Sequence, residues 1–159
     1  IRGIPLLMQL FYIYYALGSM LKVSPTVAAV AALSICYGAY MGEVFRAGIL
    51  SVPKGQSEAA RSLGFNRFQT MTLVILPQAL RTIIPPVGNE SIALLKDTSL
   101  VSVIAVADVL RRGREYASQT FEYFETYTVI ALVYLIITLL LSKVLSMVEG
   151  RLSRYEHHR

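Results

Sequence analysis

The sequence lacks tryptophan altogether and contains a single cysteine, Cys36, so no disulfide can form within the chain. Charge is also scarce, since 16% of the 159 residues are Asp, Glu, Lys or Arg, against about a quarter in an average soluble domain. No charged residue occurs in 23–42 or in 126–142. About 20 apolar residues cross a hydrocarbon core of roughly 30 Å. This composition argues against a soluble enzyme, a disordered chain and a disulfide-stabilised scaffold.

The apolar residues gather in segments, which predict an all-α integral membrane protein, a bundle of about four transmembrane helices. Ser24-Pro25 opens the second segment with proline at a favourable first helical position. A shorter apolar helix over 98–107, which need not cross the membrane, follows the third segment. The four predicted segments are 4–21, 25–42, a broken span over 72–95, and 126–142.

The third segment is called broken because charged residues and two prolines interrupt it. A helix exposed to lipid is not compatible with Arg81, Pro85, Pro86 and Glu90. They are compatible with a helix that is buried among neighbours or lines a water-filled path.

The formal net charge is +5, with a pI near 9.5. The basic residues are scattered and the aromatic residues lie in apolar runs, so a membrane protein with basic cytoplasmic ends explains the excess better than nucleic-acid binding. The distribution weakly favours a cytoplasmic location for 43–69 and for the tail from 143, with 108–125 outside. The bases of that tail are Lys143, Arg151, Arg154 and Arg159.

Residues 51–77 contain signals for a compact helical elbow. Ser57 is predicted to cap a short helix over 58–63, and Gly64 supplies the left-handed residue that ends it. Asn66 and Gln69 have the spacing of a capping box at the start of a second helix. Such an elbow suits docking into a groove of a partner protein, with apolar anchors at Phe65 and Phe68. The alternative is an ordinary cytoplasmic loop that happens to be helical.

Three separated motifs resemble those of one protein family. The pattern of the cytoplasmic "EAA" loop of bacterial ABC-transporter permeases resembles that of Glu58-Ala59-Ala60, Gly64, Val74 and Leu76-Pro77. The family usually has Ile where this chain has Val74. The segment 2–9 looks like the "RGTPLLVQ" of the polar amino-acid permeases, with Ile4 in place of Thr, and 88–90 and 94–100 are similar to their "GNE" and "LLKDTSL" segments.

The resemblance implies that residues 1–159 are an ABC permease domain, incomplete at its N-terminus, with a coupling loop at 51–70. It also implies about five transmembrane helices in the full chain. Such permeases form homo- or heterodimers in the bacterial cytoplasmic (inner) membrane, dock onto cytoplasmic ATPases, and receive a polar amino acid from an extracytoplasmic binding protein. The chain has no phosphate-binding loop, so ATP and Mg would be bound by the partner ATPase and this chain would be no enzyme and need no cofactor of its own. The residues implied to couple to the ATPase are Glu58, Ala59, Ala60, Gly64, Leu76 and Pro77.

Two acids, Glu90 and Asp97, lie at membrane depth and seven residues apart, which places them on one face of a continuous helix at a separation of about 10 Å. They are candidates to bind the ammonium groups of an amino acid. In the alternative interpretation, Lys96 and Arg81 neutralise the acids and lock helices together. Candidates for binding the carboxylate end are Asn89, Ser91, Thr98 and Ser99.

Other functions are weighed on the same residues. The first alternative is a permease for another small solute, which the EAA loop fits although the other two motifs favour amino acids. The second is a membrane scaffold or channel subunit without an ATPase partner. His157 and His158 do not make a metal site without further ligands, so no metal is expected. The tyrosines of the first two segments are interpreted as interfacial or packing residues: Tyr12, Tyr14, Tyr15, Tyr37 and Tyr40.

Overall fold

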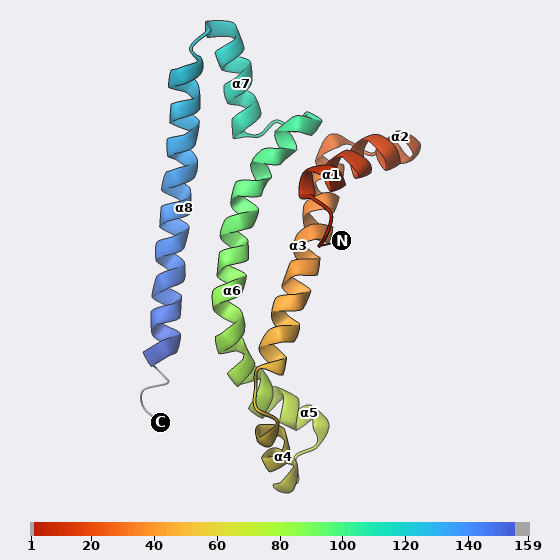
Figure 1. The fold of residues 1–159 in the computed structure, drawn as a ribbon, viewed down its shortest axis with the longest axis vertical. Helices are drawn as coiled ribbons and strands as arrows, with labels where there is room; N and C mark the ends of the chain where they lie inside the picture. The colour runs from red at the N-terminus through yellow and green to blue at the C-terminus, as the bar shows by residue number, and fades with distance from the viewer. Residues whose placement is uncertain (1, 155–159) are drawn as a thin grey trace. The chain divides into compact units, whose positions relative to one another are not determined.

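The computed structural model describes residues 2–154, with side chains as far as Gly150. These residues form helices and connecting turns without any β-strand, which confirms the predicted all-α class (Figure 1). The chain divides into two compact units, the first formed by residues up to Tyr40 with Ser91–Lys143, the second by Met41–Glu90 with the chain from Val144 onward. Several predicted features lie outside the described residues or side chains: the ends of the predicted domain at 1 and 155–159, the histidines 157 and 158, and the bases at 151, 154 and 159.

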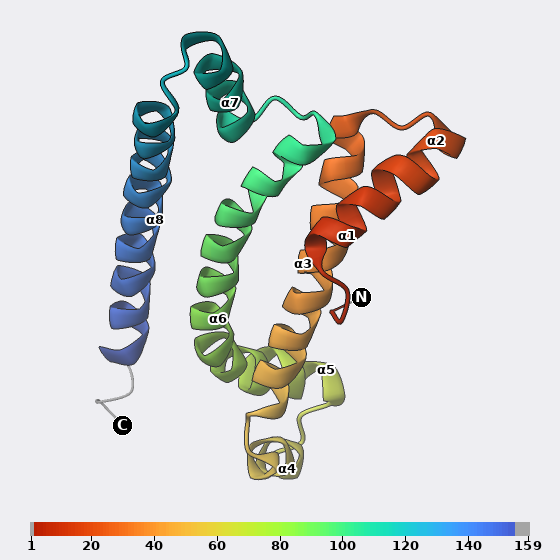
Figure 2. The ribbon, with the colours of Figure 1, turned by 45° about the horizontal axis from the view of Figure 1, so that its top comes forward.

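Three helices of the described chain are long and apolar enough to cross a membrane: Pro25–Leu50, Arg67–Ile104 and Tyr123–Gly150. The first predicted segment forms a shorter apolar helix, Leu6–Leu21, which comprises α1 (Leu6–Phe11), a π-helical stretch η1 (Tyr12–Leu17) and α2 (Gly18–Leu21). This short helix belongs to the first unit, where it lies across the beginning of α3 (Figure 2).

The core of the first unit joins three segments that are far apart in the sequence. One cluster of fully buried residues contains Leu10 of α1, Ala28 and Ala32 of α3, and Ile104 of the 3₁₀ helix η3 (Thr98–Ile104). The small residues of α3 allow this close approach, as their sequence pattern indicates.

Helix α3 (Pro25–Leu50) begins at the predicted proline but continues eight residues beyond the predicted end at Gly42. The additional turns contain Glu43 and Arg46, which form an i,i+3 ion pair at 2.6 Å. Charged residues marked the end of the apolar segment in the sequence, but an ion pair on the surface of a helix is compatible with its continuation.

The third span is not broken where the sequence predicted it to be. Helix α5 (Arg67–Gln69), a π-helical stretch η2 (Thr70–Ile75) and α6 (Leu76–Asp97) follow one another directly, and α6 passes through Pro85 and Pro86. Proline is tolerated in membrane helices because neighbouring groups and local adjustments satisfy the freed backbone atoms. The predicted helix over 98–107 is the 3₁₀ helix η3, which ends at Ile104 before the left-handed Ala105.

The π-helical stretch η2 has a local cause. Pro77 has no N–H group, and its ring clashes with the carbonyl group four residues earlier in a regular α-helix. A wider turn with i→i+5 hydrogen bonds relieves this conflict. The π-helix therefore begins at the last residue of the coupling loop, Thr70, and ends at Ile75, two residues before Pro77.

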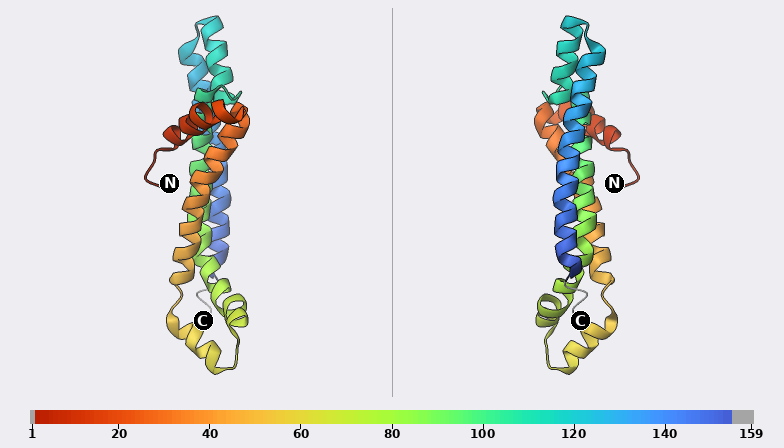
Figure 3. Two further views of the ribbon diagram at one scale, coloured as in Figure 1. Left: turned by 90° about the vertical axis from the view of Figure 1, so that its right-hand side faces the viewer. Right: turned by 90° about the vertical axis from the view of Figure 1, so that its left-hand side faces the viewer.

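Helix α7 (Val109–Thr120) and the beginning of α8 (Tyr123–Arg154) form a hairpin (Figures 1 and 3). Asp108 caps α7 by accepting a hydrogen bond from the backbone N–H of Arg111 at 2.9 Å. A Cβ atom at Gly113 would overlap the side chain of Ile130, so glycine permits the close packing of the two helices. The hairpin turns at Phe121, which has a left-handed backbone.

Candidate coupling and substrate sites

Two helices and a tight turn form the coupling loop, residues 51–70, which lies wholly within the second unit (Figure 3). The first helix, α4 (Lys54–Ser62), begins four residues earlier than predicted, with Pro53 rather than Ser57 at its N-cap. Ser57 lies inside the helix, where its hydroxyl donates to the backbone carbonyl of Lys54 at 2.8 Å. The predicted cap at Ser57 is therefore wrong, because a proline just before the helix already fixes its start.

The turn after α4 and the start of α5 agree with the prediction. Gly64 has a φ of +86°, a left-handed conformation that favours glycine. The N–H of Phe65 donates to the carbonyl of Ala60 at 3.1 Å, which closes the end of the helix. Asn66 accepts from the N–H of Gln69 at 2.9 Å, and the Gln69 side chain accepts from the N–H of Asn66 at 3.0 Å. This is the predicted capping box.

The paired alanines of the coupling loop differ in their surroundings. Ala60 is only 4% exposed and belongs to the interior of the loop, whereas Glu58 and Ala59 are exposed. Leu63 and Phe68 are among the most exposed large apolar side chains, at 78% and 76%. The loop thus presents one carboxylate beside a small residue and two apolar side chains, a pattern typical of a protein-binding surface.

The remaining residues predicted to couple to the ATPase lie where the loop joins the long helix. Leu76 is half-buried and Pro77 is exposed. The next residue, Gln78, donates from its side-chain amide to the carbonyl of Val74 at 2.8 Å. This hydrogen bond satisfies a carbonyl within the π-helical stretch, so the irregular turn is stabilised by a neighbouring side chain.

In the first unit, Asp97 has a partner that the sequence did not reveal. The hydroxyl of Tyr37, on α3, donates to Oδ2 of Asp97 at 2.8 Å. Tyr37 is 7% exposed, and a buried tyrosine hydroxyl usually has a hydrogen-bond partner. The general interpretation of Tyr37 as a packing residue therefore missed this contact, for which the only sequence signal is a tyrosine within an apolar helix.

The predicted polar neighbours of Asp97 have their hydroxyl protons engaged locally. Thr98 donates to the carbonyl of Leu95 at 2.6 Å, and Ser99 donates to the carbonyl of Lys96 at 2.8 Å. Ser91 is half-buried in the same unit. The hydroxyl oxygens of Thr98 and Ser99 retain lone pairs, whereas their protons are already used.

Glu90 and Asn89 belong to the second unit, where Glu90 is half-buried and Asn89 is exposed. Among the described side chains, no ion pair connects Arg81 or Lys96 with Glu90 or Asp97. The alternative in which these bases neutralise the acids therefore receives no support from the geometry.

Comparison with known proteins identifies the family. Residues 1–154 match the model of the family described as "binding-protein-dependent transport system inner membrane component". The chain belongs to this family. The permease is thus a membrane component of a transport system that works with a binding protein.

Individual relatives agree with this assignment. The glutamine transport system permease protein GlnP of Escherichia coli K12 is 44% identical over 155 residues, which cover 96% of this chain and 71% of that protein. The L-cystine transport system permease protein TcyB of Bacillus subtilis 168 is 46% identical, with 98% and 67% covered. A solved structure described as an amino acid ABC transporter with histidines is 46% identical and has a TM-score of 0.88, with 94% of this chain and 71% of that chain covered.

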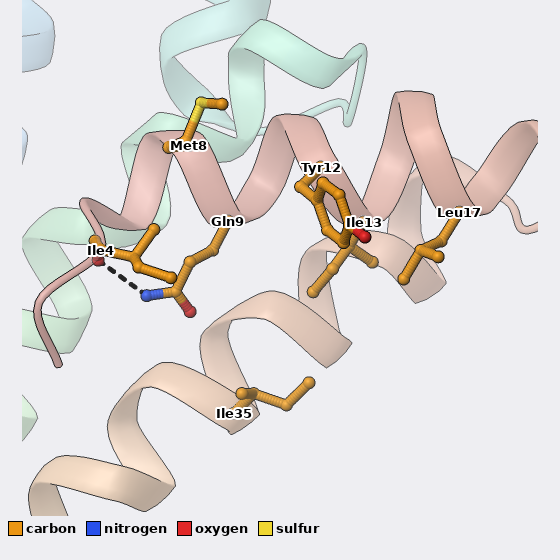
Figure 4. A pocket seen from close by; sticks show the side chains of 7 residues that line it. All are labelled: Ile4, Met8, Gln9, Tyr12, Ile13, Leu17 and Ile35. Carbon is orange, nitrogen blue, oxygen red and sulfur yellow. Dashed lines mark hydrogen bonds between the residues drawn. The ribbon is translucent and has the colours of Figure 1, made fainter. Parts of the chain in front are cut away.

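The permease also contains an apolar groove of about 560 Å³ within its first unit (Figure 4). Gln9 is the one amide side chain in its lining, and its nitrogen donates to the carbonyl of Ile4 at 2.8 Å. Ile4, the residue that replaces the threonine of the family motif, lies on the wall of this groove. The lining residues are Ile4, Met8, Gln9, Tyr12, Ile13, Leu17 and Ile35.

Proposed function

We propose that this permease translocates polar amino acids inward across the bacterial cytoplasmic membrane, driven by a separate cytoplasmic ABC ATPase. The observation that supports this most strongly is the coupling loop: a capped helix–turn–helix with an exposed Glu58-Ala59 surface, which leads directly into a membrane-spanning helix. Named relatives of the chain carry glutamine or cystine. A second permease chain, an extracytoplasmic binding protein and the surrounding lipid complete the assembly, and the ATPase binds ATP and Mg.

The coupling mechanism follows from the direct connection of loop and helix. Residues 67–97 run from the coupling loop into the membrane without an intervening non-helical segment. A displacement of the loop by the ATPase therefore moves the membrane helix itself, as expected for hinge or rigid-body transitions. The contact with the ATPase is formed by Glu58 and Ala59 and shaped by the turn at Gly64. The buried Ala60 holds the loop together. The junction between the loop and the membrane helix contains Leu76 and Pro77.

We also propose that Asp97 and Glu90 bind ammonium groups of the substrate. Both lie on α6, at a spacing of two helical turns, and neither has an ion-pair partner among the described side chains. A carboxylate without an ion pair is costly at membrane depth unless it is hydrated, accepts hydrogen bonds, as Asp97 does from Tyr37, or meets a cation. The residues proposed for the carboxylate end of the substrate are Asn89, Ser91, Thr98 and Ser99; Thr98 and Ser99 would bind it by turning their hydroxyl protons away from the carbonyls of Leu95 and Lys96.

The test uses full-length permease, reconstituted in proteoliposomes with its ATPase and binding protein. ATP-driven uptake of labelled arginine, histidine and glutamine is compared between wild type, Glu90→Gln, Asp97→Asn and Glu58→Ala. We expect Glu58→Ala to lower uptake while ATP hydrolysis remains measurable. We expect Glu90→Gln and Asp97→Asn to lower uptake while the ATPase stays bound. Unchanged uptake in both acid variants would remove them from the substrate site, and unchanged coupling in Glu58→Ala would contradict the proposed role of the loop.

A further inference from the structure

A small polar cavity lies in the second unit, where the end of α3 meets the first turns of α6. It has a volume of about 220 Å³, and we call it the polar notch. Its lining contains one basic residue and no acidic residue. The lining residues are Ser51, Val52, Pro53, Gln78, Arg81 and Thr82.

The polar notch contains hydrogen-bond donors, and none of its lining residues carries a carboxylate to accept from them. Within the described side chains, no ion pair or hydrogen bond involves the guanidinium group of Arg81. Thr82 adds a hydroxyl group, whereas the amide protons of Gln78 are already directed to Val74 and, at 3.4 Å, to Gln56. The free groups of the notch are therefore a planar cation and a hydroxyl, the combination that binds phosphate oxygens.

The position of the notch along the membrane normal favours a lipid as the source of that phosphate. Helix α3 has 26 residues, a length of about 39 Å at 1.5 Å per residue. The hydrocarbon core is about 30 Å thick, and about 40–45 Å with the headgroups. Because α3 ends at Leu50, the notch begins with Ser51 at the depth of the phosphate layer on the side of the coupling loop.

We propose that the polar notch binds the phosphate group of an anionic phospholipid, with Arg81 as its main ligand and Thr82 as a second donor. The lipid would be held between the end of α3 and α6, directly beside the coupling loop. Anionic lipids of the cytoplasmic leaflet are attracted to basic residues at this depth. The proposal rests on the family membership of the chain and on its insertion in a membrane, and it does not depend on which solute is carried.

The experiment measures lipid retention by the purified permease–ATPase complex, using native mass spectrometry with added dioleoyl-phosphatidylglycerol or dioleoyl-phosphatidylcholine. We expect wild type to retain phosphatidylglycerol in preference to phosphatidylcholine. Arg81→Gln should lower this retention at least about fivefold, since each base near an anionic surface contributes a factor of that order. Arg81→Lys should retain part of the preference, because it keeps the charge but not the planar fork.

Arg67→Gln is the matched control, because it removes one exposed cation of the same unit that does not line the notch. Equal phosphatidylglycerol retention in wild type and Arg81→Gln would overturn the proposal, as would an equal loss in Arg67→Gln. Displacement of the lipid by inorganic phosphate at equal concentration would assign the notch to free phosphate. Lipid retention that occurs only in permease without its ATPase would contradict the proposal. It would indicate that an acidic group of the ATPase occupies the polar notch in the complex. Because no transport is measured, these outcomes are independent of the amino-acid uptake experiment.

Discussion

At the scale of single residues, two local signals of the coupling loop predicted the conformation correctly, whereas the equally local cap at Ser57 was wrong. Gly64 and the capping box of Asn66 and Gln69 could be predicted because each depends on backbone atoms within a few residues. The hydrogen bond between Tyr37 and Asp97 joins residues 60 positions apart, and no local pattern specifies such a partner. The same holds for Arg81, which forms no ion pair among the side chains that the structure describes, a feature visible only in three dimensions.

The contact between Tyr37 and Asp97 leads to a residue-scale prediction. Tyr37→Phe removes the donor and leaves the carboxylate in a half-buried position with one hydrogen bond fewer. We expect a loss of stability of about 1–3 kcal/mol, since hydrogen bonds to charged groups contribute this much. The measurement is thermal unfolding of the detergent-solubilised permease, with Tyr40→Phe as the control that removes a hydroxyl from the same helix.

A double-mutant cycle separates the contact from other effects of the substitution. If the hydroxyl acts through Asp97, the loss caused by Tyr37→Phe should shrink strongly in an Asp97→Ala background. Equal losses in both backgrounds would mean that the two side chains do not interact in the folded protein.

At the scale of elements, the apolar segments and the two helices of the coupling loop were predictable, but helix α7 and several boundaries were not. The signals for helix ends derive from soluble proteins, in which prolines and charged residues mark the limits of a helix. In α6 the prolines are tolerated, and in the last turns of α3 the ion pair of Glu43 and Arg46 fits a continuing helix. The π-helical stretch η2 was not predicted, although its cause, Pro77, is visible in the sequence.

Pro77 leads to a prediction about coupling. Pro77→Ala restores an N–H group, so the turns before it can adopt regular α-helical hydrogen bonds. We expect the variant to fold and to bind its ATPase, but to transport less amino acid for each ATP hydrolysed, because the junction between coupling loop and helix is rotated. The measurement is the ratio of uptake to ATP hydrolysis in proteoliposomes.

Pro86→Ala is the matched control for this variant. Pro86 also lies inside α6, but the residues from Leu76 up to it are α-helical. An unchanged ratio in Pro77→Ala, or an equal reduction in Pro86→Ala, would show that the irregular turn before Pro77 has no special part in coupling.

At the scale of the whole molecule, composition alone predicted a membrane protein, and the motifs predicted the family that the comparisons identify. The sequence could do this because membrane insertion depends on summed hydropathy rather than on particular contacts. The orientation in the membrane is predicted from the distribution of basic residues along the whole chain, with 43–69 on the cytoplasmic side and 108–125 outside.

Orientation is tested by labelling of introduced cysteines. In a Cys36→Ser background, Ser62→Cys reports on the coupling loop and Ser118→Cys on helix α7; both serines are exposed. In intact cells, we expect a membrane-impermeant maleimide to label Ser118→Cys at least about tenfold faster than Ser62→Cys, since one spanning segment, Arg67–Ile104, separates them. Labelling of both from the same side would contradict the predicted crossing. Permeabilised cells provide the control that both thiols are reactive.

The π-helical stretch also affects which changes of chain length the permease can tolerate. A deletion of one residue in a regular helix rotates everything beyond it by about 100° and shifts it by about 1.5 Å. Within Thr70–Ile75 the chain already contains the extra residue of a wider turn. Loss of one residue there would convert the wide turn to an ordinary one and keep the register of α6, whereas the same loss after Leu76 would turn Asp97 away from Tyr37. Shortening of the chain is therefore expected to be tolerated at this one place on the long helix.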